Sequence, residues 1–397
     1  MTGPLQGIRV VEMGVWVAGP SCSAVLADWG ADVIKVEPLA GDPMRSMERA
    51  YGGINPPFEL DNRGKRSLAV DLRGEDGKEI VHGLLAQADV FVTNFRPGGL
   101  ERAGLDYESL HARYPRLIYA AVTGYGLTGP ERDRAAYDVG AFWARSGIVH
   151  ALTADGMQLP YQRGGMGDHM TGLSAAGGVS AALFHRERTG EGQLVTASLL
   201  RLGSYLLGWD HNVTARLGID TTPVSRTAPP NPIMNSYPCG DGRWLMMLGL
   251  EGERHWPGVV RALDRPEWSE DPRFVTLEAR RANSAVLVSA IEEVLATRSR
   301  AEWGEIFDRE DVWWAPVQST LEMRDDPQAR AIGCYVETPL PDGSTAEMVA
   351  SPVDFSAAPW SVDLPTPELG QDTEVILMEL GYDWDRIEQL KASGIIP

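Results

Sequence analysis

Cysteine is scarce in this chain of 397 residues, and its three copies, Cys22, Cys239 and Cys334, lie far apart. An odd number of scattered cysteines argues against a disulfide framework and against a cysteine-based metal site. The seven histidines show no HxH or HxxxH spacing, the kind of pattern that lets neighbouring imidazoles share a zinc ion. We therefore expect no bound metal.

Long apolar runs are missing as well. No stretch approaches the roughly 18 apolar residues that a membrane-spanning helix needs, and the segment 1–7 lacks the basic and apolar regions of an export signal. A hydrophobic content of 43% with 23% charged residues is typical of a soluble globular protein. We expect a cytoplasmic protein without membrane contact, and its length indicates two domains or one large α/β unit.

Positive charge is in short supply, since the formal net charge is −19. Nucleic acid needs a basic surface, so this balance argues against nucleic acid as a partner. The basic residues of the first 135 positions nevertheless gather in three groups at the edges of predicted strands: Arg63, Lys65, Arg66 and Arg73; Arg96 and Arg102; Arg132 and Arg134. Each group forms either a site for a small anionic ligand or an ordinary solvated surface, and both interpretations stay open.

The first half of the chain alternates short, β-rich apolar runs with helical patterns. Strands are predicted at 8–13, 32–37, 67–72, 89–95 and 117–123, and helices at 19–29, 75–87 and 107–113. Pro20 suits the first position of the first helix. The alternation predicts an α/β fold with a large, Rossmann-like, doubly wound domain whose parallel sheet is buried on both faces. Its ligands should lie beyond the carboxyl ends of the strands.

The rest of the chain predicts the domain boundaries. Helical patterns cover 138–147 and 168–218 apart from a strand at 193–197, and the segment 221–232, rich in Pro, Thr and Asn, is predicted to be a linker. A strand at 244–248 and helices near 254–263, 285–297 and 300–307 follow. We expect a large domain at 1–220, a small α+β domain at 226–330, and a C-terminal segment, 331–397, that returns to the large domain with a helix at 372–380.

The segment Gly164–Gly172 (GGMGDHMTG) places a carboxylate, Asp168, at the start of a predicted helix and behind a glycine run. As an N-cap, Asp168 would accept a main-chain N–H and stabilise the helix by about 0.5–2 kcal/mol. As a nucleophile or base, it would sit at the positive end of the helix dipole, where glycines leave the main chain bare for a substrate. His169 projects about 100° away on a helix and is not expected to be its base.

Other catalytic motifs are weaker. The turn Gly14–Pro20 (GVWVAGP) lacks G-x-G-x-x-G, and Pro20 removes a phosphate-binding N–H, which argues against a dehydrogenase. A P-loop is absent. Because no G-x-S-x-G elbow occurs either, Asp168 remains the best candidate nucleophile.

Ten short motifs run through nearly the whole chain. They are LQGIRV (5–10) with AGP (18–20), GADVIKVEP (30–38) with GDP (41–43), NRGKRS (62–67) with DL (71–72), NFRPG (94–98), GYG (124–126), GP (129–130), YD (137–138), GD (167–168), TGEGQ (189–193) and LGQDT (369–373). In this order they resemble the class III coenzyme A transferases, a family that includes formyl-CoA transferase, carnitine CoA-transferase and α-methylacyl-CoA racemase.

The resemblance implies a mechanism in which an aspartate attacks an acyl-CoA thioester, giving an aspartyl–acyl anhydride and CoA thiolate. The thiolate then forms an aspartyl-CoA thioester, and an acceptor carboxylate takes over the CoA. By position the nucleophile is Asp168, which should stay ionised at neutral pH while nearby glycine N–H groups stabilise the oxyanion. Coenzyme A is then a substrate, no cofactor is tightly bound, and the family's interlocked homodimer is expected.

The resemblance also transfers the family's CoA contacts to this chain. Arginine suits the adenosine phosphates of CoA because its forked donors bind two oxygens at once. The residues expected to contact CoA are Ala18, Leu72, Arg73, Asn94, Phe95, Arg96, Arg102, Tyr137 and Asp138.

Two differences from the family's motifs narrow the predicted activity. The racemases have a histidine where this chain has Tyr137. The pKa of a tyrosine is about 10 and that of an imidazole about 6.5, so a tyrosine transfers protons less readily at neutral pH than a histidine does. This favours CoA transfer over an α-methylacyl-CoA racemase; a CoA-binding protein without turnover is a second alternative. The glycine-rich loop of formyl-CoA transferase is missing at 231–241, and Val17 and Pro38 replace polar residues of that enzyme, so formyl or oxalyl specificity is not predicted.

The acid substrates are less well defined. Trp16, Phe142, Trp143, Trp209, Trp313 and Trp314 supply more aromatic surface than a small diacid needs. This surface serves either a bulky, hydrophobic acyl group or ordinary core packing, and we take the bulky acyl group as a hypothesis.

Overall fold

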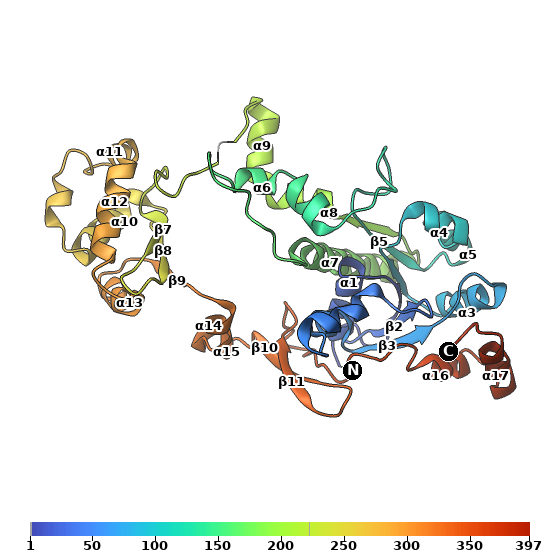
Figure 1. Ribbon diagram of the computed structural model, residues 1–397. Coiled ribbons are helices and arrows are strands. Elements are labelled where there is room, and N and C mark those ends of the chain that lie inside the picture. The colour runs from blue at the N-terminus through green and yellow to red at the C-terminus, as the bar shows by residue number, and fades with distance from the viewer. Residues whose placement is uncertain (1, 222) are drawn as a thin grey trace. The chain divides into compact units, whose positions relative to one another are not determined.

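The computed structural model describes residues 2–221 and 223–397 (Figure 1). Met1, and Thr222 in the predicted linker, lie outside the described residues. The chain forms two compact units. The first contains the residues up to Ile148 together with Tyr161–Gly218 and Gly333–Pro397, and the second contains Val149–Pro160 and Ile219–Ile332. The division into a large domain at 1–220, a small domain at 226–330 and a returning C-terminal segment at 331–397 stays a prediction.

The first unit is built on a sheet of six strands, each parallel to its neighbours. The strands are β1 (Arg9–Met13), β2 (Asp32–Glu37), β3 (Lys65–Ala69), β4 (Val90–Thr93), β5 (Ile118–Thr123) and β6 (Leu194–Ser198). Their order, β3-β2-β1-β4-β5-β6, is that of a doubly wound sheet, with the direction of winding reversed between β1 and β4. A ligand site is therefore expected at the carboxyl ends of these two strands.

Alternate residues of the strands face opposite sides, and each side buries its own apolar cluster. Val10, Val33 and Val92 pack with helices α1 (Ala18–Asp28) and α7 (Met166–Thr189) on one face. Val11, Ile34 and Phe91 pack on the other face with apolar residues of five further helices. These helices are α3 (Glu75–Leu85), α4 (Pro97–Ala103), α5 (Tyr107–Arg113), α16 (Thr373–Glu379) and α17 (Trp384–Ala392). Helices on both faces explain why the strands bury apolar residues on both sides.

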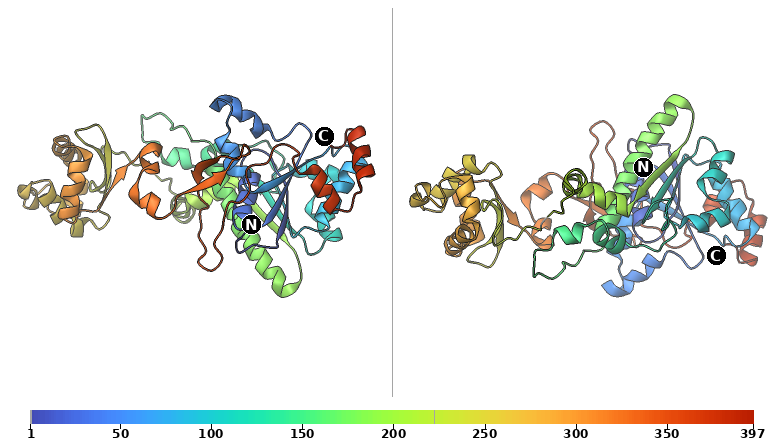
Figure 2. Two further views of the ribbon diagram at one scale, coloured as in Figure 1. Left: turned by 90° about the horizontal axis from the view of Figure 1, so that it is seen from below. Right: turned by 90° about the horizontal axis from the view of Figure 1, so that it is seen from above.

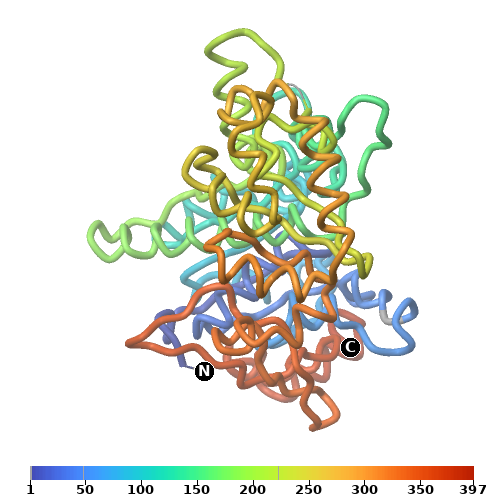
Figure 3. Tube along the Cα trace, turned by 90° about the vertical axis from the view of Figure 1, so that its left-hand side faces the viewer, coloured from blue at the N-terminus to red at the C-terminus, as the bar shows by residue number. Residues whose placement is uncertain are grey.

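The C-terminal tail, red in Figures 2 and 3, lies beside the blue N-terminal part of the chain in this unit. The amide of Asp71 donates to the carbonyl of Ile395 (2.8 Å), and the amide of Asp372 donates to the carbonyl of Ser67 (3.0 Å). The antiparallel hairpin of β10 (Tyr335–Pro339) and β11 (Thr345–Val349) belongs to the same unit.

The remaining helical elements before residue 219 connect these layers. They are η1 (Pro43–Tyr51), α2 (Pro56–Asn62), the π-helical turn η2 (Val139–Ala144), α6 (Ile148–Ala151), α8 (Leu199–Leu206) and α9 (Gly208–Leu217). Within the described residues, no helix combines the length and the apolar character needed to cross a bilayer.

The second unit contains an antiparallel sheet of β7 (Met234–Pro238), β8 (Trp244–Leu248) and β9 (Trp314–Val317), with β8 in the middle. Its core includes the buried side chains of Tyr237, Trp256, Leu287 and Phe307. Its further helices are α10 (Gly252–Ala262), η3 (Pro266–Ser269), α11 (Leu277–Ala282), α12 (Ser284–Leu295), α13 (Arg300–Arg309), α14 (Thr320–Arg324) and α15 (Pro327–Ala331).

Several predicted element boundaries were wrong. The strand expected at 67–72 is β3 at 65–69, because the Lys65 side chain is buried in the sheet with a carboxylate partner, which a hydrophobic pattern does not reveal. Pro20 is the third residue of α1 rather than the first. The helix expected at 138–147 is a short π-helical turn followed by α6, and α17 was missed.

Candidate active site

Helix α7 carries Asp168 in its first turn. The helix begins at Met166, and Gly165, with a φ of +82°, precedes it as an N-cap without a side-chain hydrogen bond. Asp168 is therefore the third residue of the helix, and its interpretation as the N-cap is wrong. Glycine adopts a left-handed conformation without the steric penalty of a side chain, so Gly165 lets the chain turn into the helix here.

Two glycines bring the start of α7 close to its neighbours. A Cβ on Gly167 would lie 2.4 Å from Cγ of Phe142, and a Cβ on Gly172 would lie 2.1 Å from Oγ of Ser21 in α1. The expectation that the glycine run leaves the main chain bare is thus wrong at Gly167, which is buried against the Phe142 ring. Gly164 is exposed, and no described atom lies within 4 Å of the position of its Cβ.

The carboxyl group of Asp168 is held in an environment that disfavours its charge. Burial, followed by the negative charge of Asp138, raises the pKa of Asp168 to about 7, although the nearby His169 acts in the opposite direction. At neutral pH about half of this group is protonated. The expectation that Asp168 is fully ionised at neutral pH was wrong, because the helix terminus does not compensate for burial and a second carboxylate.

His169 faces a different carboxylate from its sequence neighbour. Its Nε2 lies 3.0 Å from Oδ1 of Asp61, which is buried. Burial opposes the charged imidazole, but the hydrogen bond and charge of Asp61 raise the pKa of His169. The ring is therefore not positioned as the base of Asp168, and it adds a positive charge near the carboxylate. The described residues contain no cluster of three or more His, Cys, Asp or Glu arranged to hold a metal ion.

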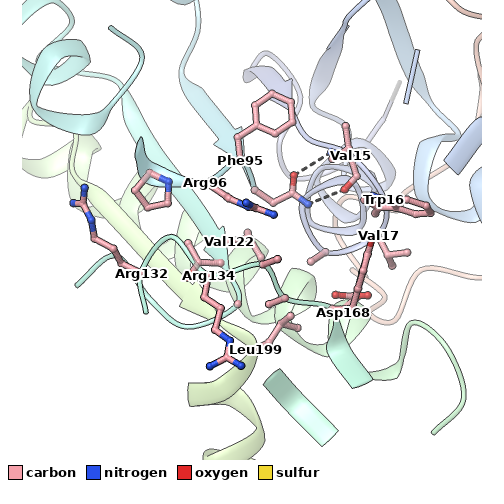
Figure 4. A pocket seen from close by; sticks show the side chains of 18 residues that line it. Val15, Trp16, Val17, Phe95, Arg96, Val122, Arg132, Arg134, Asp168 and Leu199 are labelled. Carbon is pink, nitrogen blue, oxygen red and sulfur yellow. Dashed lines mark hydrogen bonds between the residues drawn. The ribbon is translucent and has the colours of Figure 1, made fainter. Parts of the chain in front are cut away.

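Asp168 lines a cavity of about 270 Å³ at the carboxyl ends of β1 and β4 (Figure 4). The other lining residues are Val15, Trp16, Val17, Ala18, Asn94, Phe95, Arg96, Pro97, Val122, Thr123, Gly124, Arg132, Arg134, Ala135, Ala136, Tyr137 and Leu199. In the view of Figure 4, Trp16, Val17 and Asp168 lie on the right, and Arg132 and Arg134 lie on the left. The cavity thus combines one carboxylate, several arginines and an apolar wall.

The arginines of the cavity differ in whether a carboxylate neutralises them. Arg132 pairs with Glu101 (2.9 Å) and Asp133 (3.1 Å), and Arg134 pairs with Glu131 (2.5 Å). Arg96, which is exposed, has no carboxylate partner among the described residues. Its guanidinium group is therefore available to an anionic ligand.

Three members of the first basic group, Arg63, Lys65 and Arg66, are held in ion pairs within the fold. Arg63 is buried and pairs with Asp28 (2.8 Å), and Lys65 is buried and pairs with Glu12 (2.6 Å). Arg66 pairs with Asp32 (2.8 Å). Only Arg73 of this group is largely exposed, and it pairs with Asp71 (2.7 Å).

The loop between β1 and α1 forms the apolar wall beside Asp168. Trp16 in this loop has a φ of +63°, a left-handed conformation that costs a bulky residue about 1–3 kcal/mol. Asn94, expected to contact CoA, uses both ends of its amide here: Oδ1 accepts from the amide of Val15 (3.0 Å), and Nδ2 donates to the carbonyl of Val15 (2.7 Å). The amide of Trp16 donates to Oδ1 of the buried Asp42 (3.0 Å).

A second cavity, of about 510 Å³, opens at the carboxyl ends of β2 and β3. Leu72, Arg73 and Phe95 are among the residues that line it, together with Pro38 and Leu39. Phe95 lines both cavities, so the two sites are adjacent at this ring. An extended ligand could occupy both.

The structure brings most of the predicted site residues together. Ala18, Asn94, Phe95, Arg96, Tyr137 and Asp168 line the first cavity, and Leu72, Arg73 and Phe95 line the second. Two predicted contacts line neither cavity. Asp138 is buried and accepts a hydrogen bond from Nε2 of Gln162 (3.0 Å), and Arg102 is exposed on α4.

The aromatic residues behind the bulky-acid hypothesis differ in their surroundings. Trp16 lines the first cavity, whereas Phe142 is buried beneath Gly167. Trp209 is 91% exposed on α9, and Trp313 and Trp314 belong to the second unit. These positions do not test the hypothesis of a bulky, hydrophobic acyl group, which stays a prediction.

Sequence reasoning missed Lys35 and Asp42 as supports of the cavity. Nζ of Lys35 donates to Oδ2 of Asp42 (3.0 Å) and to the carbonyl of Gly14 (3.1 Å), and its side chain is fully buried. A lysine inside the apolar run DVIKVE was the available signal, because a charge in a buried strand requires a partner.

Comparison with known proteins supplies the context for this geometry. A family model described as CoA-transferase family III matches residues 5–373. The chain is 34% identical to (R)-2-hydroxy-4-methylpentanoate CoA-transferase of Clostridioides difficile, over 99% of both chains. It is 33% identical to cinnamoyl-CoA:phenyllactate CoA-transferase of Clostridium sporogenes, over 98% of this chain and 96% of that protein. A crystal structure of a CAIB/BAIF family protein from Brucella suis superposes with a TM-score of 0.85 at 32% identity, covering 96% of this chain and all of that one (100%).

Proposed function

The chain belongs to CoA-transferase family III, and on that basis we propose that Asp168 is the nucleophile of a CoA-transferase. The family acts on an acyl-CoA and a carboxylic acid, and this protein is an enzyme of that kind. One observation carries the assignment. Among the residues that line the first cavity in the described chain, Asp168 is the only carboxylate, and no Ser, Cys, Lys or His accompanies it.

The reaction proceeds by exchange at three carbonyl carbons, those of the donor acyl group, of Asp168 and of the acceptor acid. An oxygen of the Asp168 carboxylate attacks the thioester carbonyl, the C–S bond breaks, and an aspartyl–acyl anhydride and CoA thiolate form. The thiolate attacks the aspartyl carbonyl and releases the first acid as its carboxylate, leaving an aspartyl-CoA thioester. The acceptor carboxylate then attacks the aspartyl carbonyl of this thioester, the C–S bond breaks, and a second anhydride and CoA thiolate form. The thiolate attacks the acceptor's carbonyl, the bond from that carbon to the Asp168 oxygen breaks, and Asp168 leaves as its carboxylate. No net proton is consumed.

The environment of Asp168 suits this chemistry. A half-buried carboxylate has lost part of its hydration, so less water must be removed before it attacks an uncharged thioester. The raised pKa also means that a substantial fraction is ionised, and so competent to attack, at neutral pH.

Coenzyme A is proposed to run from the second cavity to the first along Phe95. The exposed Arg96 precedes α4 and the exposed Arg102 lies in its last turn, and neither has a carboxylate partner among the described residues. Forked guanidinium donors suit phosphate oxygens, so these two residues support binding of the nucleotide end of CoA. Leu72 and Arg73 would then contact the same end in the second cavity, and Asp168 would meet the thioester at the other.

The acid partner is proposed to carry a bulky, apolar side chain. Val15, Val17, Val122 and Leu199 line the first cavity beside Trp16. Two relatives are named for 2-hydroxy-4-methylpentanoate and for phenyllactate, both acids of this type.

Hydroxylamine trapping tests the nucleophile. After incubation with an acyl-CoA, hydroxylamine should convert residue 168 to a hydroxamate that peptide mass spectrometry locates. Asp168→Ala should lose more than about 1,000-fold in kcat while CoA still binds, and Asp155→Asn, a change at an exposed aspartate of the second unit, should have no effect. A hydroxamate at another position, or normal turnover by Asp168→Ala, would overturn the assignment. Incorporation of solvent deuterium at the α-carbon without CoA exchange would instead indicate a racemase.

We also propose that the enzyme forms the interlocked homodimer of its family. Helices α8 and α9 expose an apolar stripe at helical spacing, in which Tyr205, Trp209, Val213 and Leu217 are 79%, 91%, 38% and 66% exposed. Such a stripe is typical of a surface covered by another chain. Light scattering should give the mass of two chains. Tagged and untagged dimers should not exchange subunits over hours in native buffer, because interlocked chains must unfold to separate; a monomer or rapid exchange would contradict the proposal.

A further inference from the structure

The loop Gly14–Val17 is unusual because a tryptophan occupies a left-handed conformation in it. Only three non-glycine residues of the described chain have a positive φ, and the other two, Asp264 and Asp311, are aspartates, which tolerate this region better. A bulky residue stays in such a conformation only where its surroundings hold it there. The strained residue lies on the wall of the first cavity beside Asp168.

Three side chains hold the main chain of this loop. Lys35 binds the carbonyl of Gly14, Asn94 binds both the amide and the carbonyl of Val15, and Asp42 accepts from the amide of Trp16. Asp42 is itself fixed, because Oδ2 accepts from Nζ of Lys35 (3.0 Å) and Oδ1 accepts from the amide of Met44 (2.9 Å). Four successive polar groups of the loop are thus bonded to side chains rather than to water.

The consequence of this arrangement is the position of one ring. The Trp16 indole meets the Tyr137 ring edge to face, with centroids 5.9 Å apart and planes at 89°. Both rings line the cavity, and Tyr137 is still 61% exposed, so the pair offers aromatic surface to a ligand. The other residues on this side, Val15, Val17 and Leu199, are aliphatic.

We propose that Trp16 is the specificity-determining residue for the acid, and that Asp42 and Asn94 are positioning residues that hold it. The ring receives the branched or aromatic side chain of the acid whose carboxyl group reacts at Asp168. This inference rests on the proposed CoA-transferase function. It also assigns Asn94 to the support of the loop rather than to CoA binding.

Trp16→Gly separates the ring from the backbone strain, since glycine adopts a φ of +63° freely. The ratio of kcat/KM for an aromatic or branched acid to that for acetate should fall by about tenfold or more in Trp16→Gly, and should be largely kept in Trp16→Phe. Trp384→Gly, a matched change at a half-exposed tryptophan outside the cavity, should leave the ratio unchanged. A ratio in Trp16→Gly equal to that of the wild type overturns the inference.

Asn94→Ala tests the positioning role. The ratio of kcat/KM for the bulky acid to that for acetate should fall as in Trp16→Gly, while the KM for acyl-CoA stays within about twofold of the wild-type value. A raised KM for acyl-CoA with an unchanged ratio would mean that Asn94 is a CoA contact. If Asn94→Ala does not fold, Asp42→Asn, which keeps the acceptor for the Trp16 amide but loses the charge beside Lys35, should lower the same ratio. Hydroxylamine trapping in each variant separates the proposal for Trp16 from the proposal for Asp168. A variant that loses the preference for the bulky acid but still forms the hydroxamate at residue 168 has an intact nucleophile, so its defect concerns Trp16 alone.

Discussion

At the scale of single residues, Asp168 illustrates how surroundings decide the chemistry of a carboxyl group. Its place in the first turn of α7 favours the anion through the helix dipole. Burial and the charge of Asp138 act against the anion and raise the pKa of Asp168 to about 7. The outcome is a nucleophile that is half protonated at neutral pH, which has two measurable consequences.

The first consequence concerns rate. Only the ionised carboxylate attacks the thioester, so kcat/KM should rise with pH, with a midpoint near 7 and a plateau above about pH 8. Removing the charge of Asp138 in Asp138→Asn should lower the pKa of Asp168 and move the midpoint to lower pH. The shape of a pH profile from 5 to 9 is the measurement. A midpoint that does not move in Asp138→Asn would show that Asp138 does not influence the nucleophile.

The second consequence concerns stability. The folded-state pKa of Asp168 lies above the unfolded value of 3.8, so the folded state binds the proton more tightly. Below about pH 4 both states are protonated, and as pH rises from about 4 to 7 ionisation of the unfolded state lowers the free energy of unfolding. Asp168→Asn should therefore unfold like the wild type at pH 4 but be more stable at pH 8, by on the order of 2 kcal/mol after allowance for partial exposure.

Urea denaturation at both pH values measures this difference, with Asp155→Asn as the control at an exposed site. Equal stability of wild type and Asp168→Asn at pH 8 would mean that the carboxyl group is not strained by its surroundings.

At the scale of elements, the first turn of α7 is placed by contacts that only glycine permits. Phe142 of η2 packs on Gly167, directly before the nucleophile, and α1 packs on Gly172. The close approach of η2 and α1 to the start of α7 therefore determines where the carboxylate of Asp168 lies.

Gly167→Ala tests this packing. The added Cβ would lie 2.4 Å from Cγ of Phe142, so either the ring or the helix start must move. We expect a loss of about 1–3 kcal/mol in the free energy of unfolding and at least about tenfold in kcat. Gly164→Ala, three residues earlier, meets open space and should leave both quantities unchanged. Equal effects in the two variants would contradict the argument.

At the scale of the whole molecule, a buried ionic cluster joins the strands beneath the active site. Glu12 of β1 accepts from Nζ of Lys35 in β2 (2.9 Å) and from Nζ of Lys65 in β3 (2.6 Å), and all three side chains are fully buried. Burial alone would raise the pKa of Glu12, but the two ammonium groups outweigh it and lower that pKa to about 2. The cluster extends through Lys35 to Asp42 and the Trp16 loop.

Glu12→Gln should leave the buried ammonium group of Lys65 without a carboxylate partner and that of Lys35 with Asp42 alone. We expect a loss of about 3–5 kcal/mol in the free energy of unfolding at pH 7. Because the folded pKa of Glu12 is depressed, its contribution is present above about pH 4.5 and is lost as the pH falls toward 2, so the two proteins should converge in acid. The control is Glu75→Gln at the exposed Lys78–Glu75 pair, which should change stability by less than about 1 kcal/mol. A loss in Glu12→Gln no larger than in this control would show that the cluster does not stabilise the fold.

The sequence by itself determined the α/β class, the parallel sheet and the family, because alternating apolar runs and ten local motifs are properties of short segments. Asp168 and seven of the nine residues predicted to contact CoA line one of the two cavities, and their roles stay predictions. Local patterns carry this information since strand and helix periodicity depend on neighbours along the chain.

Only the tertiary structure decided which charges are buried and which are free. In the fold, Arg63 and Lys65 form buried ion pairs instead of an anion site. Burial raises the pKa of Asp168. Lys35, Asp42 and Asn94 bind the main chain of the loop that contains the strained Trp16. These properties depend on groups that are far apart in sequence and come into contact only when the chain folds. Burial and Coulomb interactions act through space, and no pattern of neighbouring residues determines them.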